Sequence, residues 1–175
     1  MLAKIKQRLK DMGTLRQLLE KAESCARAEG AAEPGSEHLV MAALTLADGT
    51  ARGAFRRVGA DPAKFAPSVT QQYADALARI GIDVGTHLIA SPDLPERPQS
   101  PGVFRSKPSA QTLMATLARD RPFGDTKPLL GADIVLAALS NDIGAVARAL
   151  AVMGITPHRL ADACRLEIAA QGSGQ

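Results

Sequence analysis

The sequence predicts an all-α protein in which one four-helix unit occurs twice. Aromatic residues make up 3% of the 175 residues, Trp is absent, and Ala and Leu supply most of the apolar side chains. This composition favours closely packed helices over a sheet, which would need β-branched and aromatic residues. In addition, the segment 36–44 (SEHLVMAAL) reappears 95 residues later as 131–139 (GADIVLAAL) with the same apolar pattern. We therefore expect two pseudo-symmetric four-helix repeats that form one eight-helix bundle.

The register of the duplication extends beyond this segment. At the same offset, Gly59 and Pro62 correspond to Gly154 and Pro157, so two G-x-x-P turns align together with the apolar run. A chain of this length fits one domain or two small units that share a core. The expected parts are a basic N-terminal helix (1–13), a first repeat (14–80), a proline-rich connector (81–108), a second repeat (109–169) and a disordered tail (170–175).

The first helix is expected to be short and basic. Its apolar residues recur at helical spacing, at Leu2, Ile5, Leu9 and Met12, with basic residues between them. Gly13 is expected to end it, and Thr14 with Gln17 forms a capping-box pattern that would open the next helix. Such a helix docks on its own domain, lies on a membrane surface or docks into a partner.

Turn residues mark the other helices of the first repeat. The helix from Thr14 should end at Gly30, and Ser36 should cap the next one. A third helix is expected from Thr50 to Val58, where Gly59 closes it.

The fourth helix has a strong start signal. Asp61 suits the N-cap and Pro62 the first helical position, where a missing N–H costs nothing. Pro67 then lies inside the expected helix, so the helix should either kink there or restart at Ser68. It should continue to Ile80.

The connector contains prolines at every third position, at Pro92, Pro95, Pro98 and Pro101. This is the period of a polyproline II helix, so a stiff surface spacer is expected, with a docking motif for a proline-binding domain as the alternative. The second repeat should begin at Ser106 or Ser109 and repeat the helices of the first.

The charge distribution argues against nucleic-acid binding. The net charge is +3 and the pI is about 9.1, but residues 1–13 hold four basic and one acidic residue. The remainder holds 17 of each and is neutral, whereas a nucleic-acid binder would need a basic stripe on its folded body. Stacking aromatics are also too scarce for single-strand binding.

The sequence favours a cytoplasmic protein. It has no signal-peptide pattern and no run near the roughly 18 apolar residues of a membrane span, so membrane contact is not favoured. Cys25 and Cys164 have neither CxxC spacing nor neighbouring histidines, so we expect buried thiols and no metal site.

The motif Gly35–Leu44 (GSEHLVMAAL), its second copy and the Asp-Pro-opened helix together resemble the Clp N-terminal repeat. That tandem module stands at the front of Clp-type AAA+ unfoldases, and the resemblance covers residues 14–169. It implies an eight-helix domain of two pseudo-symmetric halves. It also implies a module that binds adaptor proteins, substrates and unfolded segments and has no catalytic activity of its own.

Some members of the family recognise arginine-phosphorylated proteins through the Glu of this motif. Glu37 occupies that position in the first repeat, but the second repeat has Asp133 one position further on. A carboxylate could pair only with the guanidinium side of such a ligand. Recognition of arginine phosphate is therefore not favoured.

No catalytic motif is present. The chain lacks G-x-x-x-x-G-K-[ST], G-x-S-x-G, H-E-x-x-H and G-x-G-x-x-G, so we expect neither an enzyme nor a cofactor. It is either a free-standing version of the module or a fragment of a longer ATPase. The initiator Met and the polar end favour the free-standing form.

The expected binding mode is the burial of an apolar side chain in a groove between helices, rimmed by charged residues. The candidate partner-binding residues are Ser36, Glu37, His38, Arg52, Arg56 and Arg57. Glu37 and His38 have an alternative, structural role at the start of their helix. The positions equivalent to the three arginines hold Ala147, Ala151 and Val152, so the first half should present a basic surface and the second an apolar one.

The expected function is adaptor or substrate docking for a Clp-type unfoldase–protease system. Three alternatives stay open: a competitive decoy that occupies Clp adaptors, the N-terminal part of a longer Clp ATPase, and a domain that anchors a partner in a secretion machine. The sequence gives neither the partner nor the oligomeric state.

Overall fold

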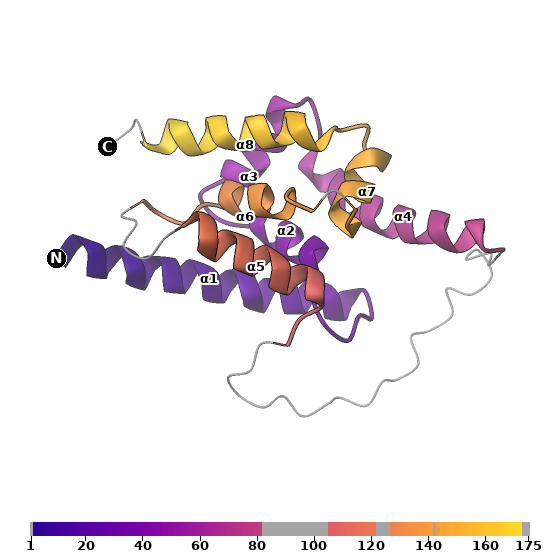
Figure 1. Ribbon diagram of the computed structural model, residues 1–175, viewed down its shortest axis with the longest axis horizontal. Coiled ribbons are helices and arrows are strands. Elements are labelled where there is room, and N and C mark those ends of the chain that lie inside the picture. Colours follow the sequence, from indigo (N-terminus) through magenta and orange to yellow (C-terminus); the bar gives the residue numbers. More distant parts are fainter. Residues whose placement is uncertain (1, 82–104, 122–126, 142, 173–175) are drawn as a thin grey trace.

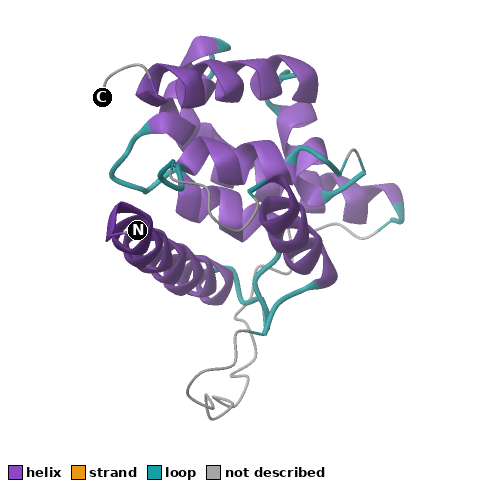
Figure 2. Cartoon of the chain, turned by 60° about the vertical axis from the view of Figure 1, so that its left-hand side comes forward, coloured by secondary structure: helices purple, strands orange, loops and turns teal. Residues whose placement is uncertain are grey.

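The computed structural model describes residues 2–81, 105–121, 127–141 and 143–172. Within these ranges the chain is helical and contains no strand, which confirms the predicted fold class (Figure 2). The longer helices α1 and α8 lie on opposite sides of the shorter central helices (Figure 1). The elements are α1 (Leu2–Ala28), α2 (Ser36–Ala43), α3 (Thr50–Arg57), the 3-10 turn η1 (Pro62–Lys64), α4 (Phe65–Arg79), α5 (Pro108–Asp120), α6 (Gly131–Ala138), α7 (Ala145–Val152) and α8 (Pro157–Gly172).

The helix boundaries follow the duplication. Helices α2 and α6 begin and end 95 residues apart, and so do α3 and α7. The turns after α3 and α7 are also the same: Gly59 and Gly154 have φ of 78° and 70°, a backbone conformation in which Gly is favoured. One residue later, the N–H of Ala60 and of Ile155 donates five residues back along the chain.

The two repeats exchange their last helices. Helix α4 of the first repeat packs on α7 of the second, and α8 of the second packs on α3 of the first (Figure 1). Helices α2 and α6 contact each other between these two pairs. Each repeat is therefore not a self-contained four-helix bundle, because its fourth helix packs on the other repeat.

The predicted break at Gly13 is wrong. Helix α1 runs without interruption from Leu2 to Ala28, so Thr14 lies inside the helix and forms no capping box with Gln17. A Cβ at Gly13 would meet nothing within 4 Å, so the position is open to solvent. An exposed Gly inside a helix lowers the stability of the helix by about 0.5–1 kcal/mol relative to Ala, and the turns on either side of Gly13 keep the helix continuous.

Pro67 neither kinks α4 nor makes it restart. Because α4 begins at Phe65, Pro67 is its third residue, where the backbone N–H has no partner within the helix. The start signal before it is confirmed, since Asp61 Oδ1 accepts the N–H of Ala63 at 3.0 Å.

At the other end of the chain, residues 170–172 belong to α8 and not to a disordered tail. Pro92, Pro95, Pro98 and Pro101 of the connector lie outside the described residues, whereas Pro108 is the first residue of α5.

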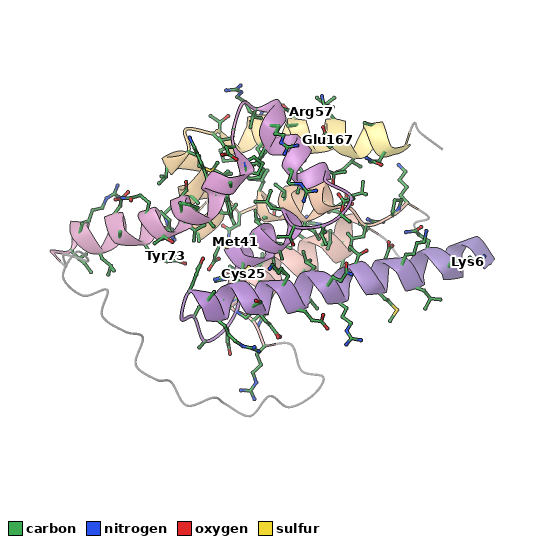
Figure 3. All side chains as sticks on the ribbon, turned by 180° about the vertical axis from the view of Figure 1, so that it is seen from behind. Lys6, Cys25, Met41, Arg57, Tyr73 and Glu167 are labelled. Carbon is green, nitrogen blue, oxygen red and sulfur yellow. The ribbon has the colours of Figure 1, made fainter. Side chains whose placement is uncertain are left out.

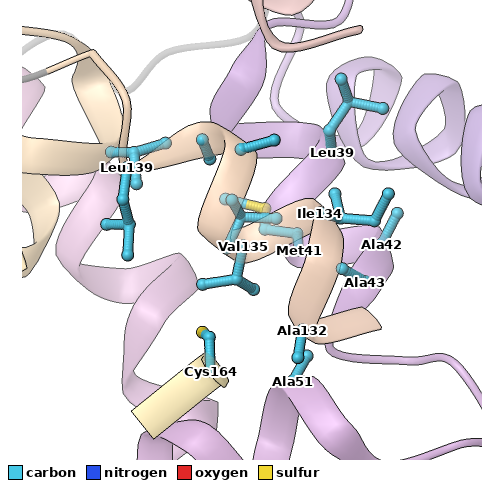
Figure 4. Close-up of a cluster of buried hydrophobic side chains, with 14 of the residues drawn as sticks. Leu39, Met41, Ala42, Ala43, Ala51, Ala132, Ile134, Val135, Leu139 and Cys164 are labelled. Atoms are coloured by element: carbon cyan, nitrogen blue, oxygen red, sulfur yellow. The ribbon is translucent and has the colours of Figure 1, made fainter. Parts of the chain in front are cut away.

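Small residues bring the central helices close together (Figure 4). Ala43, Ala51 and Ala132 are buried where α2, α3 and α6 meet. A Cβ at Gly131, the first residue of α6, would lie 3.0 Å from the carbonyl oxygen of Ala43 and 3.1 Å from Cβ of Ala51. Among the larger core side chains, Phe55 and Phe65 meet edge to face with centroids 5.8 Å apart.

Cys164 is buried in the core and Cys25 is partly buried. Burial, with a smaller contribution from Asp133, raises the pKa of the Cys164 thiol to about 12. Burial also raises the pKa of Cys25, with Glu29 adding to the effect and Lys21 opposing it. Both thiols are therefore protonated and weakly nucleophilic at neutral pH.

Two glycines provide a matched test of the packing. We expect Gly131→Ala to lower the free energy of unfolding by about 1–3 kcal/mol, because the new Cβ meets backbone that cannot move independently. Gly13→Ala should raise it by about 0.5–1 kcal/mol through helix propensity alone. Urea unfolding followed by circular dichroism measures both. A neutral Gly131→Ala would contradict the close approach of α6 to α2.

Thiol reactivity provides a second test. At pH 8 iodoacetamide should modify Cys164 at least about a hundredfold more slowly in the native protein than after unfolding, because the unfolded thiol has a pKa near 8.5. Cys25 should react faster than Cys164 in the native state. Peptide mass spectrometry over a time course gives both rates, and equal native rates would contradict the burial of Cys164.

Candidate functional site

The structure separates the six predicted partner-binding residues into three groups. Ser36, Glu37 and His38 are buried in the first turn of α2, and Glu37 and His38 are each 1% exposed. Arg52 is half-buried, whereas Arg56 and Arg57 at the end of α3 are exposed. The six residues do not form one surface.

His38 caps its own helix, which confirms the structural alternative for this residue. Its Nδ1 accepts the backbone N–H of Gly35 at 2.9 Å. The ring proton is therefore on Nε2, which donates to Glu29 Oε2 at 3.1 Å. Both ring nitrogens are occupied within the protein.

Asp133 performs the same task in the second repeat. It lies 95 residues after His38, and its Oδ2 accepts the N–H of Leu130 at 2.9 Å. Arg121 donates to the same carboxylate oxygen at 3.0 Å. Asp133 thus corresponds to His38 as a capping residue. On the sequence motif alone, Asp133 is compared with Glu37, from which it is shifted by one position.

The Glu37 carboxylate is enclosed by groups from three elements. Its Oε1 lies 3.4 Å from the hydroxyl of Tyr73, which donates to it, and 3.4 Å from Lys107 Nζ. Burial of Tyr73 and the charge of Glu37 both raise the pKa of the phenol. A Cβ at Gly35 would collide with this carboxylate, so the motif glycine leaves room for it. Ser36, next to it, is held through its backbone N–H, which donates to Ser109 Oγ at 3.2 Å.

Arg52 holds the turn that follows α2. Its Nη1 donates to the carbonyl oxygens of Leu44 at 2.7 Å and Leu46 at 3.1 Å. The same turn positions Asp48, whose carboxylate accepts the N–H of Gly131 at 3.2 Å, and Thr50, whose Oγ1 accepts the N–H of Ala132 at 2.9 Å. A loop of the first repeat therefore caps the start of α6 in the second.

Arg57 joins α3 to α8 at the surface. Its guanidinium forms an ion pair with Glu167, which Figure 3 shows beside it. A Cβ at Gly53 would lie 2.6 Å from the Glu167 carboxylate, so the glycine one turn before Arg57 makes room for this side chain. Arg56 is exposed next to it.

The second half presents an apolar surface at the equivalent place. Ala151 and Val152 are exposed at the end of α7, where the first half has Arg56 and Arg57. This confirms the expected difference between the two halves. Ala147, the third equivalent position, is half-buried.

A groove of about 410 Å³ lies between the two G-x-x-P turns, where the repeats join. From the first repeat it is lined by Val58, Gly59, Ala60, Asp61, Lys64 and Ser68. From the second it is lined by Val152, Met153, Gly154 and Ile155. One wall thus carries the exposed Lys64 and Asp61, and the other is apolar. The sequence had given no reason to group these residues, because the exchange of the fourth helices creates the groove.

A second groove, of about 470 Å³, lies between the first half of α1 and the loops before α3 and α6. Asp11 lies in it, and its Oδ1 accepts the N–H of Leu129 at 2.9 Å. This contact fixes the body-facing side of α1. Gln7 Nε2 donates to the same Asp11 oxygen at 2.8 Å.

No group of three or more His, Cys, Asp or Glu residues is placed to hold a metal ion in the ranges that the structure covers. None of the helices described is long and apolar enough to cross a membrane.

Comparison with known proteins agrees with this geometry. No curated protein matches the chain. Residues 13–96 match the family model of the Clp repeat (R) N-terminal domain. This family comprises non-catalytic domains that bind proteins such as substrates and adaptors. This match over residues 13–96 bears out the resemblance to the Clp repeat N-terminal domain that the motif Gly35–Leu44 indicated.

Proposed function

We propose that this protein is a non-catalytic docking module that binds apolar, acid-flanked peptide segments of adaptors or substrates for a Clp-type unfoldase–protease system. Its binding site is the groove between the two G-x-x-P turns. The single observation that supports this best is the composition of that groove, with the apolar side chains of Val152 and Met153 on one wall and Lys64 beside Asp61 on the other.

The groove suits the anchoring of one or two side chains. An apolar side chain would contact Val58 on one wall and Val152 and Met153 on the other, and would lose its contact with water. Arg56 and Arg57 are on the last turn of α3, directly before Val58, so they extend the positive rim beyond Lys64. Glycine at the two turns leaves part of the lining as bare backbone, whose polar groups can pair with a peptide.

The buried residues of the motif do not line the proposed site. Ser36, Glu37 and His38 are enclosed, so in this proposal they fix the start of α2 and do not contact the partner. Arg52 likewise acts through the turn that it holds. The direct contacts of the first half come from Arg56, Arg57 and Lys64.

Two variants test the groove. The probe is a fluorescent peptide in which two Leu residues lie between Asp and Glu. Val152→Asp should weaken its binding roughly tenfold or more because apolar contact is lost. Arg56→Glu/Arg57→Glu should weaken it by a similar factor because the charge of the rim is reversed. Fluorescence anisotropy measures the affinity. Arg119→Glu, an exposed change on α5, is the control. Unchanged binding by both groove variants would refute the site, and thermal melts show whether loss of the Arg57–Glu167 pair affects folding.

A reconstituted unfoldase–protease assay tests the role. If the module delivers substrates, adding it should accelerate degradation of a tagged substrate. If it occupies adaptors as a decoy, degradation should slow. In either case Val152→Asp should remove the effect, and an unaltered degradation rate at saturating module would exclude both roles.

A further inference from the structure

Two large apolar side chains on the first half of α1 are exposed in the described part of the structure. Leu9 is 64% exposed and Met12 is 67% exposed. They belong to the repeat Leu2, Ile5, Leu9 and Met12, here called the outer stripe, whose members follow one another at alternating spacings of three and four. This is the spacing of the contact seam in a coiled coil.

The body cannot cover this stripe. The opposite side of α1 is attached to the domain through Asp11, which binds the N–H of Leu129, and through the buried Leu18 and Ala22. Because Gly13 does not interrupt the helix, these contacts also fix the rotation of the first three turns. In a continuous helix Leu9 lies about 160° from Asp11 at 100° per residue. Leu9 therefore faces away from the domain.

The positions beside the stripe are basic. If Leu2 and Leu9 are assigned to position a of a heptad repeat, Lys6 occupies position e and Arg8 position g. In coiled coils the charges at positions e and g determine which helices pair. Lys6 is exposed, near the free end of α1 (Figure 3), and Lys10 is exposed one turn later. A second copy of this chain would bring like charges together on both flanks, so self-association through the stripe is disfavoured.

The shape of the stripe favours a helix over a membrane surface. The stripe has two apolar positions in every seven residues and contains no aromatic side chain. Helices that lie among lipid headgroups present a broader apolar face with Trp, Phe or Leu. A narrow seam matches the seam of another helix. Acidic side chains on that helix would pair with the basic flanks.

We propose that the outer stripe of α1 is a second docking surface, which binds an amphipathic helix of a partner protein with an apolar seam and acidic flanks. The surface is separate from the groove between the two turns and does not depend on the function proposed for it. It would let one molecule hold an acidic helix of one partner while the groove binds a peptide segment.

The test uses two designed helical peptides, each three heptads long with Leu at both seam positions, one with Glu and one with Lys on the flanks. The full chain should bind the Glu peptide at least tenfold more tightly than the Lys peptide, and binding should weaken as salt is raised from 50 to 500 mM. Leu9→Ser/Met12→Ser and Lys6→Glu/Arg8→Glu should each reduce affinity for the Glu peptide at least tenfold. Leu9, Met12 and Lys6 are exposed, and Leu166→Ser, another exposed apolar position, is the control.

Other occupants give distinct results. Equal affinity for the two peptides, or binding that survives Leu9→Ser/Met12→Ser, would overturn the proposal. Two further results would also overturn it. The first is that the chain does not bind the Glu peptide but sediments with vesicles of anionic phospholipid, and that Leu9→Ser/Met12→Ser abolishes this sedimentation. The second is that the chain forms a concentration-dependent dimer that Leu9→Ser/Met12→Ser dissociates. Val152→Asp should leave Glu-peptide binding unchanged, so a failure of the groove is distinguishable from a failure of the stripe.

Discussion

The close approach of α6 to α2 and α3 is the constraint on which the rest of the structure depends. Gly131 admits the backbone of α2 so closely that a Cβ would lie 3.0 Å from the Ala43 carbonyl oxygen, and Asp48 and Thr50 cap the helix that begins there. The capping groups belong to the first repeat and the helix to the second. The two repeats are thus joined by hydrogen bonds from backbone N–H groups to side chains and by apolar contact, and neither half has a complete set of helix starts without the other.

This junction explains the exchange of the fourth helices. With α2 and α6 in contact at the centre, α3 and α7 lie on either side, and each is covered by the last helix of the other repeat. The exchange in turn places the turn after α3 opposite the turn after α7. The groove at this place has a wall from each repeat, so sequence divergence between the repeats makes it chemically asymmetric, with Lys64 on one wall and Val152 on the other.

The motif that connects this chain to its family serves mainly to start a helix. Glu37 and His38 are almost fully enclosed, and each is paired with groups of its own chain. In the second repeat Asp133 caps α6 in place of His38, and Arg121 neutralises its charge. Two different side chains therefore meet one requirement, which is to satisfy an N–H at the start of a buried helix. Surfaces that are free to bind lie at the end of α3 and α7 and on the outer side of α1.

The sequence by itself determined the helical class, the duplication and its register, because apolar periodicity and turn residues act locally and repeat at one offset. It also indicated the family that residues 13–96 resemble and the difference between the basic and apolar ends of α3 and α7. It was wrong about Gly13, because a local preference of about 1 kcal/mol for ending a helix there is outweighed by helical continuity and by the contacts that Asp11 and Leu18 make with the body. Only the tertiary structure decided that α4 and α8 change places, that Glu37 and His38 are enclosed, and that the turns face each other across a groove. Those outcomes depend on which residues far apart in the chain become neighbours, and spacing along the chain carries no information about that.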